Sequence, residues 1–421
     1  MPTSYTIPGV YVEEVSTGSR PISAVGTSTA AFLGFVSGLA PSSAAVAINN
    51  PTEFRTKIVQ QSDFRTRDDG TLPSLPTPAL FNAVLGFFGN GGSRCYVVGL
   101  DQNNSLTGGV AGRAGLDLLE TVDDVAMVAA PGLTDPGSYD LLMAHCEKMK
   151  DRIAVLDAPL AVSDVTQLTI AATVPASSAK GKAPDPSAPA GGLRPRQSNN
   201  GFGAVYYPWI QTRDAVTGAT VDTPPSGHVM GVYARVDGTR GVYKAPANEP
   251  IVGAVGLSLP VAPQDQGILN PAGVNCIRSM SEGILIWGAR TVAAEASEWR
   301  YVPVRRLFSM IEKSIERGTR WVVFEPNDEV LYKAIRRDAS AFLTVLWRQG
   351  ALRGATAEQA FFVKCDAETN PPEVVDAGQV VIVIGIAPVK PAEFVIFRIG
   401  QSSTGASTSE GDGAKAGKAA P

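Results

Sequence analysis

The sequence predicts an α/β protein whose last third changes to an α+β pattern. Between residues 76 and 210, short continuous apolar runs alternate with helical patterns, as in DDVAMVAAPG, SYDLLMAHCEKMKD and RIAVLDAP. Continuous apolar strands separated by helices are typical of a parallel sheet that is covered on both faces. From residue 276 onward, a predicted hairpin, two long helices and a run of strands replace this alternation. We therefore expect two differently built parts in one chain.

The composition is that of an ordinary globular protein. The chain has 421 residues, of which 44% are hydrophobic and 18% charged, and 36 Lys and Arg against 40 Asp and Glu give a net charge of −4. Without a basic excess, nucleic acid is not expected as a partner. The sequence has no run of about 18 apolar residues and no basic start followed by an apolar core, so neither membrane insertion nor a signal peptide is expected.

The first hundred residues predict a strand, a short helix, a long helix and a second strand. STAAFLGFVSG (28–38) is a small-residue, apolar run that ends in Gly, which favours a buried strand. PTEFRTKI (51–58) predicts a short helix with Thr52 as its N-cap. In 76–100, apolar residues recur at helical spacing until an Asn-Gly-Gly turn, after which Cys95 begins a strand.

The middle of the chain continues the alternation. GLDLLETV, DDVAMVAAPG, SYDLLMAHCEKMKD and RIAVLDAP, all within 114–160, predict helix, strand, helix and strand. Residues 174–200 are rich in Pro, Ala, Ser and Gly and contain almost no large apolar residue, so we expect a mobile surface loop. AVYYPWI (204–210) predicts another strand of the parallel sheet, and 228–250 predicts a helix, a turn and a loop.

The last third predicts a separate unit. CIRSMSEGILIWGARTV (276–292) predicts a hairpin, and 302–318 predicts a helix that begins near a Pro and ends at a Gly. RWVVFEPN (320–327) is interpreted as a strand, and 327–350 as a long helix with one apolar stripe and Asn327 as its cap. Three further strands are expected, at 360–366, 379–388 and 393–400.

No group of residues predicts catalysis, a metal site or a cofactor site. The four cysteines are scattered without metal-ligand spacing, and the two histidines are His145 and His228. We expect His145 inside a helix and His228 in a Gly/Pro-rich turn, and no nucleophile-elbow motif is present. GFFGNGG (86–92) follows a helix and precedes a strand, which is the reverse of the order in a phosphate-binding loop.

Two strand-forming segments near the chain ends have little beside them in sequence to pair with. They are YTIPGVYVEEV (5–15) and PAEFVIFRIGQ (391–401). Unpaired strands expose N–H and C=O groups that add to other sheet edges, so we expect them to pair with neighbouring subunits; the alternative is that they fold back onto their own chain. The expected arm residues are Val10, Tyr11, Val12, Val15, Phe394, Val395, Ile396, Phe397 and Ile399, and the expected receiving strand contains Val381, Ile382, Val383 and Ile384.

The order of many segments resembles that of the contractile tail sheath proteins, which build myophage tails, R-type bacteriocins and phage-tail-like contractile injection systems. The likeness extends from about Pro8 to Gln401, is interrupted at 174–200 and omits 402–421. The segments are PGVYVEE, AAFLGF, LFNAVLGFFGNGGSRCYVV, DDVAMVAAPG, AVYYPWI, RGVYKAPAN, GVNCIR, ILIWGART, RWVVFEPN, LWRQGALRG, AFFVKCD and APVKPAEFVIFRI.

The resemblance implies a two-part fold. An inner α+β domain has a mixed sheet that the terminal arms of neighbours complete, and an outer α/β domain has a subtilisin-like topology without implied catalysis. The expected divisions are an N-terminal linker arm at 1–25, an inner core at 26–100 and 250–390, an outer domain at 101–249 with a flexible insertion at 174–200, a C-terminal arm strand at 391–401 and a disordered tail at 402–421.

The resemblance also implies a structural subunit and no enzyme, cofactor or metal. Subunits stack as rings, usually hexameric, around an inner tube protein, meet baseplate and terminal cap proteins, and contract to drive the tube through a target envelope. The particle lies in the cytoplasm of the producing bacterium or forms a virion tail. Lys333, Arg336 and Arg337 are expected to face an acidic tube; a solvated basic face is the alternative. A degenerate hydrolase-like enzyme and an adhesive shell protein are the alternative functions.

Overall fold

The computed structural model describes residues 21–36, 39, 44–58, 78–108, 112–173, 191–214 and 217–394. The chain divides into a first unit up to Lys390 and a second unit from Pro391. The predicted N-terminal arm, most of the predicted C-terminal arm and the tail at 402–421 lie outside the described residues. Among the helices that are described, none is long and apolar enough to cross a membrane.

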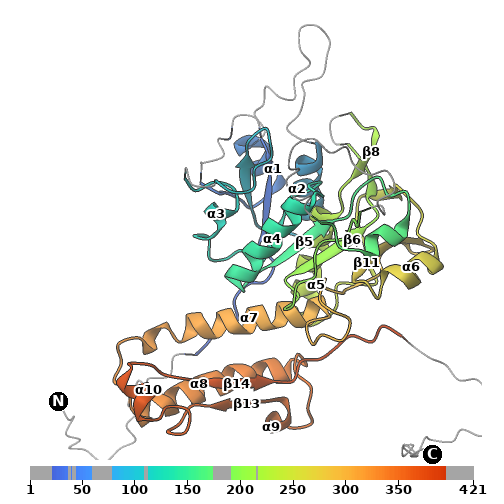
Figure 1. Ribbon diagram of the computed structural model, residues 1–421. Coiled ribbons are helices and arrows are strands. Elements are labelled where there is room, and N and C mark those ends of the chain that lie inside the picture. The colour runs from blue at the N-terminus through green and yellow to red at the C-terminus, as the bar shows by residue number, and fades with distance from the viewer. Residues whose placement is uncertain are drawn as a thin grey trace, which may run out of the picture. The chain divides into compact units, whose positions relative to one another are not determined.

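A nine-stranded mixed sheet forms the centre of the first unit (Figure 1). Its strand order is β2-β3-β1-β4-β5-β6-β11-β12-β9. The six strands from β3 to β11 are parallel, and the pairs β2/β3, β11/β12 and β12/β9 are antiparallel. The strands are β1 (Ala30–Phe35), β2 (Val46–Ile48), β3 (Cys95–Leu100), β4 (Met127–Ala129), β5 (Ile153–Asp157), β6 (Gly203–Tyr207), β9 (Glu249–Pro250), β11 (Val274–Met280) and β12 (Gly283–Ile286).

This sheet confirms the predicted parallel strands but does not follow the expected domain division. β1 lies between β3 and β4, so strands assigned to an inner and an outer domain are direct neighbours. The predicted hairpin is present as β11 and β12, but β11 pairs in parallel with β6 and joins the same sheet. Apolar patterning identifies strands, whereas it carries no information on which sheet they enter.

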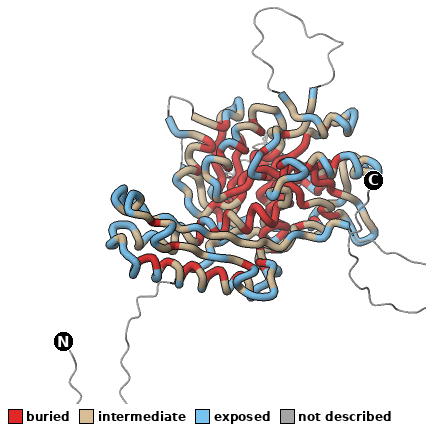
Figure 2. Tube along the Cα trace, turned by 60° about the horizontal axis from the view of Figure 1, so that its bottom comes forward, coloured by how far each residue is buried: buried red, intermediate tan, exposed pale blue. Residues whose placement is uncertain are grey.

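Helices cover both faces of the nine-stranded sheet. Successive residues of β1 alternate between two clusters: Phe32 packs with α2 and α5, whereas Ala31 and Leu33 pack with α3 and α4. Figure 2 shows buried residues concentrated in this sheet. The helices around it are α1 (Pro51–Lys57), α2 (Pro78–Gly89), α3 (Leu116–Leu119), α4 (Pro136–Met149), the 3₁₀ helix η3 (Val165–Thr169), α5 (Ser226–Arg240) and α6 (Pro263–Leu269).

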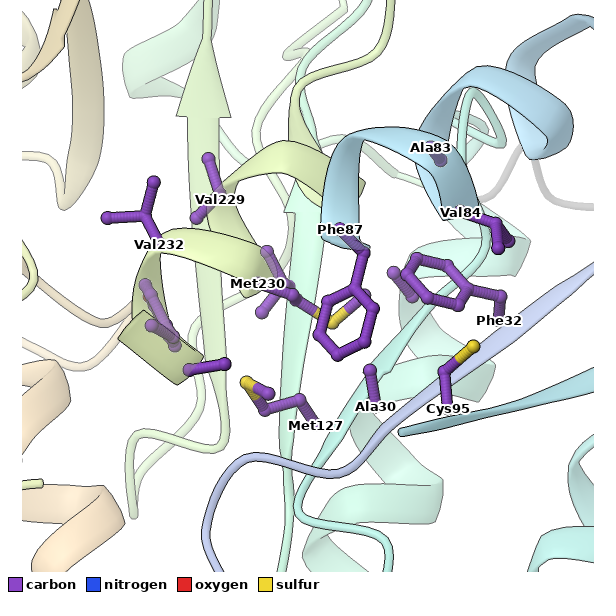
Figure 3. Close-up of a cluster of buried hydrophobic side chains, with 14 of the residues drawn as sticks. Ala30, Phe32, Ala83, Val84, Phe87, Cys95, Met127, Val229, Met230 and Val232 are labelled. Carbon is purple, nitrogen blue, oxygen red and sulfur yellow. The ribbon is translucent and has the colours of Figure 1, made fainter. Parts of the chain in front are cut away.

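The α2–α5 side of the core packs tightly around one aromatic pair. Phe32 and Phe87 meet edge to face with ring centroids 5.6 Å apart, and Figure 3 shows them together with Met230 of α5. Both rings are fully buried. Burying one such side chain contributes about 1.5–3 kcal/mol.

His228 lies inside α5, so its predicted place in a turn is wrong. Glycines at 227 and 231 suggested a turn, but here they let α5 approach α2 closely. A Cβ at Gly227 would collide with the Ala83 backbone, and one at Gly231 with the Phe87 carbonyl. The His228 ring lies directly against Gly86 of α2. Small residues one helical turn apart are thus packing positions in this sequence.

Two helix caps differ from the predicted ones. Asn50, not Thr52, caps α1, and its Oδ1 accepts from the backbone N–H three residues on at 2.8 Å. Asp328, not Asn327, caps α8 in the same way at 2.9 Å. Asn327 Oδ1 instead accepts a hydrogen bond from the Tyr332 hydroxyl. Adjacent residues of equal capping propensity are not separated by sequence alone.

The last part of the first unit consists of two long helices and a two-stranded ribbon, and α7 lies between the nine-stranded sheet and α8 (Figure 1). The predicted strand at 320–327 is wrong: these residues form the short 3₁₀ helix η4 and a turn. The remaining elements are β7 (Ile210–Arg213), β8 (Thr220–Thr223) and β10 (Ala254–Leu257) in a separate three-stranded sheet, and α7 (Val302–Gly318), η4 (Arg320–Val322), α8 (Glu329–Arg348), α9 (Ala357–Ala360), β13 (Phe361–Lys364), α10 (Pro372–Asp376) and β14 (Val383–Ile386).

Candidate assembly surface

Helix α7 has an apolar side that packs on α8 and a polar side that contacts the nine-stranded sheet body. Leu307, Met310 and Ile311 share a buried cluster with residues of α8, among them Phe342 and Leu343. The last part is therefore joined to the rest of the first unit through one amphipathic helix.

The polar side of α7 contacts the sheet body through ion pairs, of which those of Arg306 and Lys313 are nearly buried. Arg306 donates to both carboxylate oxygens of Asp237 at 2.9 and 2.5 Å and to the Thr27 carbonyl at 3.0 Å. Further along, Lys313 pairs with Asp151, and Arg317 donates to Asp123 at 3.1 Å. Removing one partner of a buried pair leaves a charge without compensation, so these contacts fix the position of α7.

The β13–β14 ribbon packs one face on the helices and leaves the other uncovered. The two strands are antiparallel, with Phe361 opposite Ile386 and Lys364 opposite Val383. The inward residues join the α7–α8 cluster. The opposite face exposes 56% of Phe362 and 42% of Val383. The exposed apolar side chains make this face of the ribbon a candidate interaction surface.

The predicted receiving strand is formed only in its second half. Val383 and Ile384 belong to β14, which within the described residues has β13 as its one sheet partner. Val381 is held differently: its N–H donates to Asn370 Oδ1 at 2.6 Å, and its carbonyl accepts from Asn370 Nδ2 at 3.1 Å. Ile382 packs on the first turns of α8. Asn370 is buried and was missed, although an Asn before a Pro pair is a turn signal.

The turn between η4 and α8 exposes a second apolar surface, which we call the Phe324 patch (Val323, Phe324 and Val330). The exposed fractions are 63%, 102% and 73%, respectively. Phe324 has a φ of 71°, in the left-handed region that bulky residues rarely adopt. The patch adjoins the segment that leads into β14, because Asn327 Nδ2 donates to the Gln379 carbonyl at 2.8 Å.

The three predicted tube-facing residues do not form one free basic face. Lys333 is exposed and lies 3.3 Å from Glu329, and Arg337 pairs with the neighbouring Asp338 at 2.9 Å. Arg336 is partly buried and donates to the Cys365 carbonyl at 2.6 Å, which ties α8 to the end of β13. Of the three, only Lys333 and Arg337 are positioned toward solvent.

Asp157, Ser226 and His228 lie near the carboxyl end of β5, but they are not arranged as a catalytic triad. Ser226 Oγ donates to Asp157 Oδ2 at 2.8 Å, and the Gly132 and Ser226 amides donate to the same carboxylate. His228 faces Gly86 rather than Ser226. A hydrolytic triad requires the histidine to contact the hydroxyl, so this cluster instead anchors the start of α5.

Burial controls the pKa values of these groups. Desolvation raises the pKa of Asp157 to about 6, against the opposing effect of its hydrogen bonds from Ser226 and Gly132. Desolvation lowers the pKa of His228 to about 4. His145 lies inside α4 as predicted, and burial and the nearby Arg152 charge lower its pKa to about 4. Within the described ranges, no three His, Cys, Asp or Glu side chains are placed to hold a metal ion.

Comparisons with known proteins agree with this architecture. The model described as the phage tail sheath protein central domain matches residues 109–292, and that of the phage tail sheath C-terminal domain matches 294–402. A chain of the extracellular contractile injection system PVC, solved as a sheath complex in the contracted state, is 30% identical, has a TM-score of 0.70, and matches over 96% of this chain and 99% of that chain. The chain belongs to the phage tail sheath family.

Two further matches differ in how much of each chain they cover. A chain in the six-fold symmetrised baseplate structure of the anti-feeding prophage is 30% identical, with a TM-score of 0.70 and coverage of 95% of this chain and 100% of that chain. The tail sheath protein of Burkholderia phage BcepMu is 30% identical over 187 residues, which are 42% of this chain and 38% of the relative. The chain spans 26% to 48% of the length of the curated tail sheath proteins it matches. The predicted family is thus confirmed.

Proposed function

We propose that the protein is the structural sheath subunit of a contractile tail or injection apparatus, and that it is not an enzyme. Subunits stack as rings, hexameric by analogy with the six-fold relative, around an inner tube and contract to drive the tube through a target envelope. The observation that carries this proposal is the match over nearly the whole of both chains to a sheath complex in the contracted state. Baseplate and terminal cap proteins are the further partners, and the particle forms in the producing bacterium's cytoplasm or as a virion tail.

The terminal arms are proposed to link the subunits. Residues 5–15 and 391–401 of neighbours add to the β13–β14 ribbon, whose uncovered face and edges support such an addition. Burying about four large side chains per arm gains roughly 6–12 kcal/mol. Ordering about seven backbone residues costs roughly 7–14 kcal/mol, so one arm is near break-even. Several arms per subunit then become effective through their high local concentration.

The finer parts of the architecture are also proposals. The inner domain contains the ribbon with α7 and α8, and the outer part has a subtilisin-like topology; the parallel, doubly covered sheet supports an α/β outer part. Lys333 and Arg337 meet the tube through weak exposed ion pairs that contraction breaks. Arg336 contributes less, because its guanidinium already binds the Cys365 carbonyl.

A proline in the C-terminal arm tests the proposed linkage. Ile396→Pro removes one main-chain donor from the arm without touching the body of the protein. The variant is expected to fold like the wild type but to form no sheath in negative-stain images of producing-cell lysates. Ser403→Pro, in the adjacent polar tail, is the matched control and is expected to leave sheaths intact.

Two results would contradict the proposal. Sheaths of normal length from Ile396→Pro would show that the arm does not pair through its main chain. Because a single arm is near break-even, purified wild-type subunits are expected to stay monomeric until a template is added. Spontaneous sheath formation at micromolar concentration would refute that expectation.

A further inference from the structure

The side chain of Phe324 is exposed to solvent because contacts on both sides fix the backbone of its turn. A bulky residue at a φ of 71° is strained, and such strain persists where neighbouring contacts fix the backbone. Two contacts flank Phe324: the Glu325 amide donates to the Val322 carbonyl at 3.1 Å, and Asn327 bridges Tyr332 and the Gln379 carbonyl. The turn therefore exposes an aromatic ring at the surface, at a position where a polar side chain would make the protein more soluble.

The Phe324 patch continues a buried cluster up to the surface. Trp321 and Val322 of η4 pack with Leu331 and Ile335 of α8 and with Val380 and Ile382 ahead of β14. Val381, between the last two, is 38% exposed. The patch thus lies next to the segment that leads into the proposed receiving strand.

The charges around the patch favour one of the two terminal segments. Glu325, Asp328 and Glu329 are exposed on the same turn. The N-terminal segment carries two acidic residues at 13 and 14, whereas residues 391–401 carry one acidic residue, Glu393, and one basic residue, Arg398, and are neutral overall. Opposite charges across an interface select the partner and its register, and like charges disfavour it.

We propose that the Phe324 patch is the side-chain anchor for residues 394–399 of a second copy of this chain. This rests on the proposed exchange of arms, and adds which arm docks and where its side chains go. In an extended segment, Phe394, Ile396 and Arg398 share one face. This face lies on the patch, with Phe394 and Ile396 against Phe324 and with Arg398 beside the acidic rim.

Substituting Phe324 by glycine separates docking from folding. Phe324→Gly removes the ring and also relieves the left-handed backbone, so the unfolding midpoint is expected to stay equal or rise. The subunit concentration needed for templated sheath assembly is expected to rise roughly 10- to 100-fold, the loss from leaving one aromatic contact unmade. Val345→Ser, on an exposed part of α8, is the matched control and is expected to assemble normally. Wild-type assembly by Phe324→Gly would overturn the proposal.

A charge exchange identifies the occupant. Arg398→Glu is expected to weaken assembly, and adding Glu325→Lys to it is expected to restore most of the loss. If Glu325→Lys alone instead strengthens assembly and adding Glu13→Lys removes that gain, the N-terminal segment is the occupant and the proposal is wrong. If Glu325→Lys does not restore assembly to Arg398→Glu, the proposal is contradicted as well.

A cross-linking experiment tells copies and partners apart. A photoreactive amino acid at position 324 of the full chain, in particles mixed from isotopically heavy and light copies, is expected to give heavy–light cross-links to 394–399. Cross-links within one copy, to a tube protein, or elsewhere overturn the proposal. If Ile396→Pro abolishes sheaths while Phe324→Gly does not, the anchor fails and the proposed function stands. If neither variant affects sheaths, the exchange of arms fails as well.

Discussion

Two of the three sheets described in the first unit, the nine-stranded sheet and the β13–β14 ribbon, have edges of opposite kinds. The nine-stranded sheet ends in β2, of three residues, and β9, of two residues that include Pro250. Very short edge strands and edge prolines prevent a sheet from adding foreign strands. The β13–β14 ribbon has four-residue strands and an apolar outer face at Phe362 and Val383. One region is thus closed to other chains, and the other is left open to them.

Because of this difference, we expect substitutions in one region to change mainly stability and substitutions in the other to change mainly assembly. Phe87 and Phe362 are the same residue type, but the first is fully buried between helix and sheet and the second is 56% exposed. Substitutions in the closed region should lower the free energy of unfolding, whereas those in the open region should change assembly at nearly constant stability.

The largest expected effect is on the buried aromatic core. Phe87→Ala should lower the free energy of unfolding by about 3–5 kcal/mol, because it leaves a cavity opposite Phe32. Phe362→Ala should lower it by about 1 kcal/mol or less, since its side chain is 56% exposed and its ring lies against Gly385 on the open face of the ribbon. Urea unfolding of both variants measures the contrast, and equal losses would show that the ribbon face is part of the monomer's core.

Breaking the ion pair that joins α7 to the sheet body should have the next largest effect on stability. Arg306→Met should lower the free energy of unfolding by about 3 kcal/mol, because it leaves the buried Asp237 carboxylate without its positively charged partner. The Thr27 hydroxyl still donates to this carboxylate at 2.6 Å but does not compensate its charge. The control Arg317→Met breaks a more exposed pair and should cost less than about 1 kcal/mol. If the two variants lose similar amounts of stability in thermal or urea unfolding, the buried Arg306–Asp237 pair is not the contact that contributes most to holding α7 on the sheet body.

The pH dependence of stability offers a third test. The pKa of Asp157 is about 6 in the folded state, above its unfolded value, so its contribution is fully present below about pH 4 and is lost as the pH rises through 6. The loss amounts to about 2–3 kcal/mol. Asp157→Asn should therefore remove this part of the profile, so that the wild-type advantage over the variant shrinks between pH 4 and 6. A constant difference over that range would refute the raised pKa.

Asn370 allows a smaller and more local test. Asn370→Ala removes both hydrogen bonds to the Val381 backbone and should cost about 1–2 kcal/mol. The Val381 amide should then exchange its hydrogen much faster, while amides in β5 exchange as before. Unchanged protection at Val381 would mean that another contact orders the start of β14.

The smallest effect on stability is expected at the proposed tube face. Reversing the charge of Lys333 to Glu should change the free energy of unfolding by about 0.5 kcal/mol or less, because Lys333 and its partner Glu329 are both exposed. Co-assembly with the tube at low salt should fall clearly, and salt should reduce the difference. Normal co-assembly of this variant would support the alternative of a solvated basic face.

Much of the fold follows from local patterns. The alternation of β1, α2, β3, β4, α4, β5 and β6 was predictable because each buried strand is a continuous apolar run and each helix has apolar residues at helical spacing. The strand order was not, because nothing in the sequence of β11 tells that it pairs with β6. The expected division at residue 100 failed for this reason.

The errors at the candidate site have local physical causes. RWVVFEPN has strand propensity, but Phe324 enters the left-handed region and the caps of α8 end the extended conformation. Arg336 looked like part of a basic face, although it binds a backbone carbonyl. For Arg336 a tertiary hydrogen bond decided the outcome, and propensity scales do not contain such terms. The arm residues Val10 and Ile396 lie outside the described residues, so their predicted roles stay predictions.

The spacing of the polar contacts along α7 has a mechanical consequence. Arg306, Ser309, Lys313 and Arg317 recur every three or four residues, and together they meet three segments of the sheet body, at Asp237, at Lys150 and Asp151, and at Asp123. At 1.5 Å per residue, the row is about 16 Å long. A load directed along the helix axis strains every attachment in the row simultaneously, whereas a perpendicular load unzips them one by one. The protein should thus resist sliding far better than lifting at this seam.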